Sequence, residues 1–154
     1  MAALVGAEKS RAAAASVMAT GTFWLSPAPM AAAIACLDAL EADGGAAARH
    51  MEVLGHALGE GLVVAARRHG FAVTVSGPPA MPLMTFDEEV SHARPMGERW
   101  CAAAAAGGAW LHPHHNWYLS AAHTEEDIGR TLAAAERAFE EIARGACARV
   151  RPAK

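Results

Sequence analysis

Apolar residues recur at helical spacing after a clear helix-start signal. Ser26 suits the capping position of a helix, and Pro27 suits its first turn. The apolar positions that follow lie three or four residues apart and define one helix face: Met30, Ile34, Leu37 and Leu40. Because paired glycines interrupt helices, we expect Gly44 and Gly45 to end or bend this one.

The same spacing predicts two further long helices and a shorter one. One long helix runs from about residue 46 to residue 68, with Gly70 at its C-terminal cap, and the other opens at Thr124. Their apolar stripes are Met51, Leu54, Leu58 and Leu62 in the first, and Ile128, Leu132, Ala135, Phe139 and Ile142 in the second. The shorter helix is alanine-rich, covers about residues 96–106 and stops at a glycine pair.

Short apolar stretches between these helices predict strands. They are residues 71–75, 81–86, 109–112 and 117–120. A turn at residues 76–79 would join the first two in a hairpin, and Pro82 would place the second at an edge. The order helix, helix, strand, strand, helix, strand, strand, helix predicts an α+β or α/β domain, with a small sheet covered by helices.

The composition narrows the class of protein. The 154 residues are 53% hydrophobic and 19% charged, with a net charge of −3. Such a chain is too apolar for a disordered protein, and it lacks the basic excess of a nucleic-acid binder. No stretch approaches the roughly 18 apolar residues of a membrane span, and Glu8, Lys9 and Arg11 interrupt the apolar start before a signal core could form. We therefore expect one globular domain without nucleic-acid or membrane partners.

The cysteines do not form a recognisable motif. Cys36, Cys101 and Cys147 are odd in number, widely spaced and not arranged as CxxC. This pattern argues against a disulfide framework and against a thiolate metal site. We expect free, mostly buried cysteines in a cytoplasmic protein.

Four histidines gather near the predicted last strands: His112, His114, His115 and His123. Neutral imidazole is a common metal ligand and a physiological acid or base. The spacing is not HExxH, however, and the nearby acids are explained by a helix start. Three interpretations remain open: a solvated or hydrogen-bonded loop, a polar loop facing a substrate, and a metal site, which the spacing does not favour.

The segment before Pro27 contains a second candidate site. In Gly21-Thr22-Phe23, a hydroxyl and the backbone amides of a turn precede a helix, and such groups can bind a phosphate. The alternative is an ordinary turn capped by Ser26. The chain has no GxSxG, GxGxxG or GxxxxGK[ST] motif that would indicate another chemistry.

Four segments together resemble one enzyme family. Residues 21–33 resemble the GT(F/Y)xxxPxAMAAA stretch of the class III pyridoxal-phosphate (PLP)-dependent aminotransferases, which include the glutamate-1-semialdehyde aminomutases. Residues 1–6 resemble the family segment just beyond its Schiff-base lysine, and residues 108–113 resemble its late G(V/I)xxxP strand. Residues 117–128 resemble its (F/W)(F/Y)(I/L)SxAHTxEDI ending. The resemblance covers nearly the whole chain, in order, and corresponds to the final third of the family's chains.

This resemblance implies a fold and a division of the chain. The fold would be the C-terminal part of a PLP-dependent transferase of fold type I, ending in a small α+β domain. Residues 1–26 would be a remnant of the large domain, and residues 27–45 a linking helix. Residues 46–146 would form the small domain, and residues 147–154 a tail.

The resemblance also implies a cofactor site and a reaction. Thr22, with Gly21 and Phe23, would bind the PLP phosphate of the partner subunit across a homodimer interface. The intact enzyme would move an amino group between an amine or amino acid and a keto or aldehyde compound. The Schiff-base lysine would precede the first residue, so no catalytic residue is assigned in this chain. We expect the chain alone neither to bind PLP tightly nor to transaminate.

Two other functions remain as alternatives. His114, His115 or Asn116 would face the substrate if the resemblance holds. Otherwise the chain would be a stand-alone, non-catalytic α+β binding or assembly domain, or a metal protein built on the histidines. Metal analysis would test the last of these.

Overall fold

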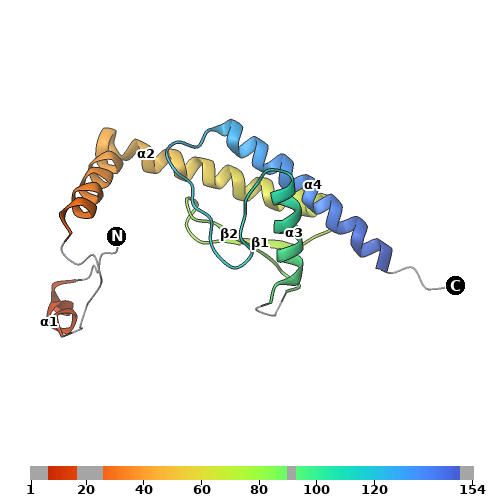
Figure 1. Ribbon diagram of the computed structural model, residues 1–154, viewed down its shortest axis with the longest axis horizontal. Helices are drawn as coiled ribbons and strands as arrows, with labels where there is room; N and C mark the ends of the chain where they lie inside the picture. Colours follow the sequence, from red (N-terminus) through yellow and green to blue (C-terminus); the bar gives the residue numbers. More distant parts are fainter. Residues whose placement is uncertain (1–6, 17–25, 90–92, 150–154) are drawn as a thin grey trace. The chain divides into compact units, whose positions relative to one another are not determined.

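The computed structural model describes residues 7–16, 26–89 and 93–149 (Figure 1). The chain divides into two compact units, residues 1–46 and residues 47–154.

The described part of the first unit is mostly helical. It contains the 3-10 helix η1 (Glu8–Ser10), the short helix α1 (Arg11–Ala15) and the first part of the helix α2 (Pro27–Arg68). The α2 backbone leaves the helical conformation over residues 42–45, where Gly44 and Gly45 have positive φ angles of 65° and 86°. Glycine tolerates this left-handed region better than other residues. The predicted start at Pro27 and the predicted bend at the glycine pair are therefore confirmed.

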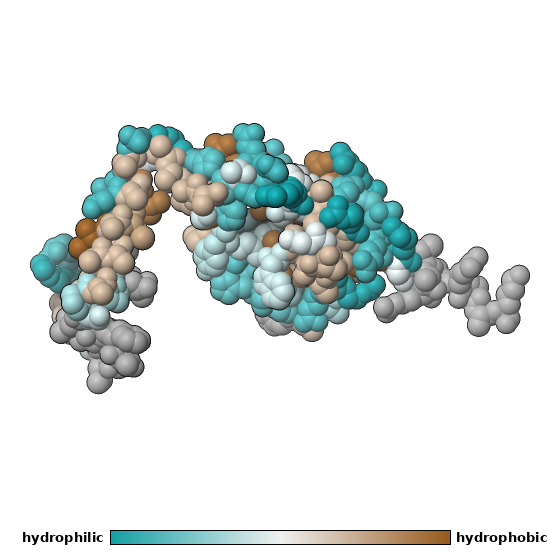
Figure 2. Space-filling view, turned by 45° about the horizontal axis from the view of Figure 1, so that its top comes forward, coloured by the Kyte–Doolittle hydropathy of each residue, from teal (hydrophilic) through white to brown (hydrophobic). Residues whose placement is uncertain are grey.

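The apolar face of this first part of α2 is exposed. The side chains remain 45%, 60%, 59% and 39% accessible in Met30, Ile34, Leu37 and Leu40, respectively. Figure 2 shows apolar surface along this segment. This part of α2 thus has the apolar stripe that is typical of a helix packed on a core. Within the described residues of the first unit, no core covers that stripe.

The second unit is an α+β domain. It contains the rest of α2, the strands β1 (Val73–Ser76) and β2 (Leu83–Phe86), and the helices α3 (Pro95–Ala106) and α4 (Glu125–Arg149). The strands pair antiparallel, with Thr74 opposite Thr85, and form a two-stranded sheet. The predicted fold class and the hairpin are confirmed. No helix in the described ranges combines the length and the apolarity of a membrane span.

An aromatic cluster lies at the centre of this unit. Trp100 of α3 and Phe139 of α4 are fully buried, and their ring centroids are 5.1 Å apart. Phe71 and Phe86 complete the cluster at 5.9 and 6.0 Å from the Phe139 ring. The apolar stripes predicted for the second part of α2 and for α4 both contribute to the core around this cluster. Within these stripes, Met51 and Leu132 are only half-buried.

Glycines allow the hairpin to approach α2. A Cβ atom on Gly55 would lie 1.9 Å from the backbone oxygen of Pro79, a distance that real atoms cannot adopt. A Cβ atom on Gly59 would lie 3.4 Å from the Val75 side chain. The turn after β1 therefore packs directly on the α2 backbone, which the periodicity of α2 alone does not reveal.

The two later strand predictions are wrong. Residues 109–112 and 117–120 lie in an irregular connection between α3 and α4. The Trp117 N–H does donate to the Pro82 carbonyl, at 2.9 Å. Proline has no N–H with which to return a bond, so a regular ladder cannot form at this point.

Candidate functional site

Of the two predicted sites, the structure describes the residues of the histidine-rich connection but not those of the phosphate site. Gly21, Thr22 and Phe23 lie outside the described residues, so the phosphate-site prediction stays a prediction. His114, His115 and Asn116 lie in the connection between α3 and α4. We call residues 112–116 of this connection the histidine loop.

Trp117 anchors the base of the histidine loop. Its indole ring stacks on the buried ring of Trp100, with centroids 6.3 Å apart. Its Nε1–H donates to the backbone oxygen of His112 at 2.9 Å, across the loop. Because its own backbone N–H is held by Pro82, both ends of the loop are fixed to the core of the domain.

The imidazole rings lie together at the tip of the loop. The ring centroid of His112 is 6.0 Å from that of His114 and 6.4 Å from that of His115. Nδ1 of His112 accepts a hydrogen bond from the His114 backbone at 3.1 Å, so this nitrogen carries no proton. Among the described residues, no three His, Cys, Asp or Glu side chains are arranged to hold a metal ion.

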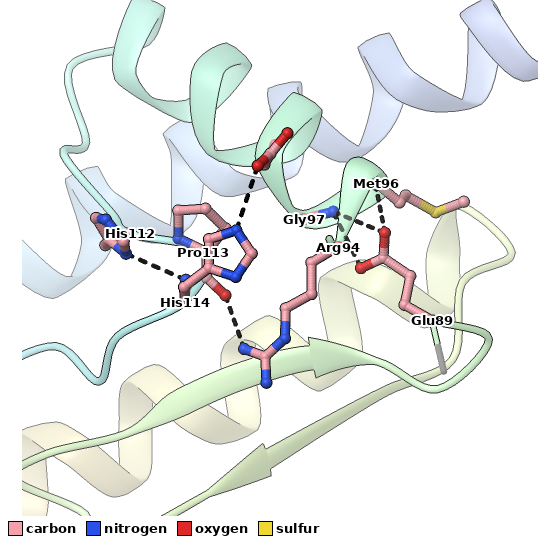
Figure 3. Close-up of polar contacts among 8 residues, drawn as sticks. Glu89, Arg94, Met96, Gly97, His112, Pro113 and His114 are labelled. Carbon is pink, nitrogen blue, oxygen red and sulfur yellow. Dashed lines mark hydrogen bonds and ion pairs between the residues drawn. The ribbon is translucent and has the colours of Figure 1, made fainter. Parts of the chain in front are cut away.

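The start of α3 contacts the histidine loop (Figure 3). Nη1 of Arg94 donates to the backbone oxygen of Pro113 at 2.8 Å. Nε2 of His114 lies 3.2 Å from Oε1 of Glu98, and it must be the donor because a carboxylate only accepts. Sequence reasoning missed both contacts, since the partners lie 19 and 16 positions apart along the chain.

A cavity of about 430 Å³ opens beside the loop. Its walls are mainly apolar and aromatic, and they come from α2, the irregular connection and the first turns of α4: Leu58, Leu111, Trp117, Tyr118, Leu119 and Ile128. Trp110 also lines it and is 90% exposed. Sequence reasoning did not single out Trp110 or Tyr118, although aromatic residues make up only 6% of the chain.

The acid that lines this cavity is already engaged. The Asp127 carboxylate accepts hydrogen bonds from the backbone N–H and the hydroxyl of Thr124, both at 2.8 Å, and it pairs with Arg130 at 2.5 Å. These hydrogen bonds, led by the Thr124 backbone, lower the pKa of Asp127 to about 2. Asp127 therefore caps α4 as an ionised group and is poorly suited to exchange protons near neutral pH.

The buried Cys101 is not suited to act as a nucleophile. Burial raises the pKa of the Cys101 thiol to about 11, so it stays protonated near neutral pH. Cys36 is exposed, contrary to the expectation of mostly buried cysteines, because it lies on the uncovered first part of α2.

Comparison with known proteins identifies similar aminotransferases. No protein-family model matches the chain. The chain is 40% identical over 145 residues to the aminopentol aminotransferase of Sphingopyxis macrogoltabida. This match covers 92% of the chain but only 33% of that protein.

Solved structures show the same relationship. The FumI protein of Sphingopyxis sp. MTA144, in its PLP internal aldimine form, matches 93% of the chain with a TM-score of 0.75 and 37% identity. An omega-transaminase from Sphaerobacter thermophilus matches 84% of it with a TM-score of 0.71 and 20% identity, a likeness of fold alone. The chain has the fold of part of a PLP-dependent transaminase. It spans about a third of the length of each of these proteins.

Proposed function

We propose that this chain is the C-terminal part of a class III PLP-dependent aminotransferase, which moves an amino group between an amine or amino acid and a keto or aldehyde compound. The observation that carries the proposal is the 40% identity to an aminotransferase over nearly the whole chain. When bound, PLP supplies the electron sink for the bond that breaks at the amine-bearing carbon.

The name of a similar protein supports a class of substrate for the whole enzyme. That protein is named for aminopentol, an amine with several hydroxyl groups. We infer a hydroxylated amine as amino donor, and transfer to a second molecule rather than the internal transfer of an aminomutase. Exposed imidazoles on the histidine loop offer hydrogen bonds to hydroxyl groups, which supports a substrate-facing role for His114, His115 and Asn116.

The chain would contribute a cofactor anchor and one wall of the site. In this proposal Thr22, with Gly21 and Phe23, holds the cofactor phosphate of a partner subunit in a homodimer. A hydroxyl and backbone amides suit an ionised phosphate.

The Schiff-base lysine would come from the part of the enzyme that corresponds to the other two thirds of its relatives. The chain alone, mixed with PLP and then with borohydride, is therefore expected to keep its unmodified mass in mass spectrometry. A stoichiometric mass increase mapped to Lys9 or Lys154 would show that the chain carries its own lysine.

A chimera tests the function directly. It joins the remaining two thirds of the Sphingopyxis macrogoltabida aminotransferase to this chain, and amino transfer to a keto acid is measured with PLP present. We expect activity, and we expect Thr22→Ala to weaken PLP binding about 10- to 100-fold, the effect of one hydrogen bond to a charged group. Thr22→Ser keeps the hydroxyl and should stay near the unsubstituted chimera. A folded, inactive chimera would favour the stand-alone domain.

A further inference from the structure

We propose that Arg94 and Glu98 are positioning residues that hold the histidine loop in one arrangement in front of the substrate. The part that concerns the substrate rests on the proposed function. The hold on the loop itself rests on the contacts of α3 shown in Figure 3.

The histidine loop cannot position itself. It belongs to neither a helix nor a strand. The hydrogen bonds within its tip join near neighbours only, as from the His114 backbone to His112 or between the His115 ring and the Asn116 oxygen. Trp117 fixes the base of the loop but does not reach the tip. The tip therefore takes its position from contacts with other elements.

Arg94 and Glu98 supply these contacts from the start of α3. Arg94 is the residue directly before the helix, and Glu98 lies in its first turn. Arg94 contacts the loop at the Pro113 oxygen, and Glu98 contacts it at the His114 ring. Two bonds to adjacent loop residues restrict both the position of the loop and the orientation of the ring.

The start of α3 is itself firmly held. The Glu89 carboxylate accepts hydrogen bonds from the backbone N–H groups of Met96 and Gly97, which a helix start leaves without helical partners. Arg94 adopts a left-handed conformation, with φ 41° and ψ 53°, directly before Pro95. A Cβ atom on Gly97 would lie 3.6 Å from the Pro113 side chain, so the loop packs against the first turn of α3.

The charges of both residues are directed at the loop. Within the described part of the chain, no carboxylate lies within ion-pair distance of the half-buried Arg94, whose hydrogen bond goes to the neutral Pro113 oxygen. Glu98 likewise has no Lys or Arg side chain within that distance there, and its contact is with the His114 ring. A charged donor makes a stronger hydrogen bond to a carbonyl than a neutral one does. Arg94 and Glu98 therefore bind the histidine loop, whereas other charged residues on the helices pair with each other at the surface.

The hold on the loop can be measured in the full 154-residue chain by NMR. Arg94→Ala and Glu98→Ala, which remove the donor and the acceptor, are expected to shift and broaden the amide signals of residues 112–116 and the ring signals of His114. Matched controls are Arg144→Ala and Glu140→Ala, which break an ion pair of 2.7 Å on α4. Loop signals that respond no more than in these controls would overturn the proposal. If Arg94→Ala does not fold, the exposed Glu98→Ala variant decides alone.

The effect on the substrate is measured in the active chimera. We expect Arg94→Ala to raise the KM for the amine about tenfold with kcat within about twofold, because one hydrogen bond to a charged group is lost. Arg94→Lys keeps a charged donor and should recover part of this loss. An unchanged KM in an active chimera overturns the positioning role and leaves the proposed function intact. An inactive chimera with the expected NMR changes overturns the proposed function and leaves the hold on the loop.

Discussion

The two parts of α2 carry the same apolar spacing and end in opposite environments. Leu37, before the bend at residues 42–45, is 59% exposed, whereas Leu62, after the bend, is completely buried. The second part belongs to a unit that also contains a hairpin, the shorter helix α3 and the long helix α4. The described residues of the first unit include only short helical turns besides α2. Periodicity thus marks the face that a helix can bury, and the available partners decide whether it is buried.

A leucine-to-alanine substitution in each part of α2 tests this difference in burial and has the largest expected effect. Leu62→Ala should lower the free energy of unfolding by about 2–5 kcal/mol, because it removes packed atoms and leaves a cavity. Leu37→Ala should change it by less than about 0.5 kcal/mol, as an exposed substitution does. Urea unfolding followed by circular dichroism measures both. A similar loss in the two variants would mean that the first part of α2 is covered in solution.

The long helices could be predicted from the sequence because their signals are local and repeated. Proline and serine mark the start at Pro27, and a stripe of many residues marks each face. The strand predicted at residues 117–120 failed because pairing depends on the partner, and Pro82 lacks the N–H that a ladder needs. The contacts of the histidine loop were hidden for a similar reason. Arg94 and Glu98 lie in another element, and no local pattern joins them to the loop.

Glycines offer a second, smaller test of how closely elements pack in the second unit. Gly55→Ala should lower the free energy of unfolding by about 1–3 kcal/mol, because its Cβ atom would meet the backbone at Pro79. Gly129→Ala in α4 is the matched control, since nothing lies within 4 Å of its Cβ position. There alanine should add up to about 1 kcal/mol through its better helix propensity. If both variants were destabilised, the loss in Gly55→Ala could not be assigned to the close contact with the Pro79 backbone.

The smallest effect concerns how the two units start their long helices. Helix α4 has three acids in its first turn, whereas the first turn of α2 has none. The pKa of Asp127 is about 2 in the folded chain, mainly because of hydrogen bonds from Thr124, and about 3.9 in an unfolded one. Because the folded value is the lower one, this contribution to stability is complete above about pH 4 and is lost as the pH falls through 2.

A carboxyl NMR titration of Asp127 measures this difference. Thr124→Ala should raise the pKa of Asp127 only part of the way to its usual value, because the backbone N–H bond remains. Thr131→Ala is the matched control, since its hydroxyl bonds to the backbone oxygen of Asp127 and not to the carboxylate. Between pH 4 and 2, amide signals of the first turn of α4 should change while those at the start of α2 do not. Equal changes at both helix starts would show that general acid unfolding, rather than the Thr124–Asp127 cap, controls this pH range.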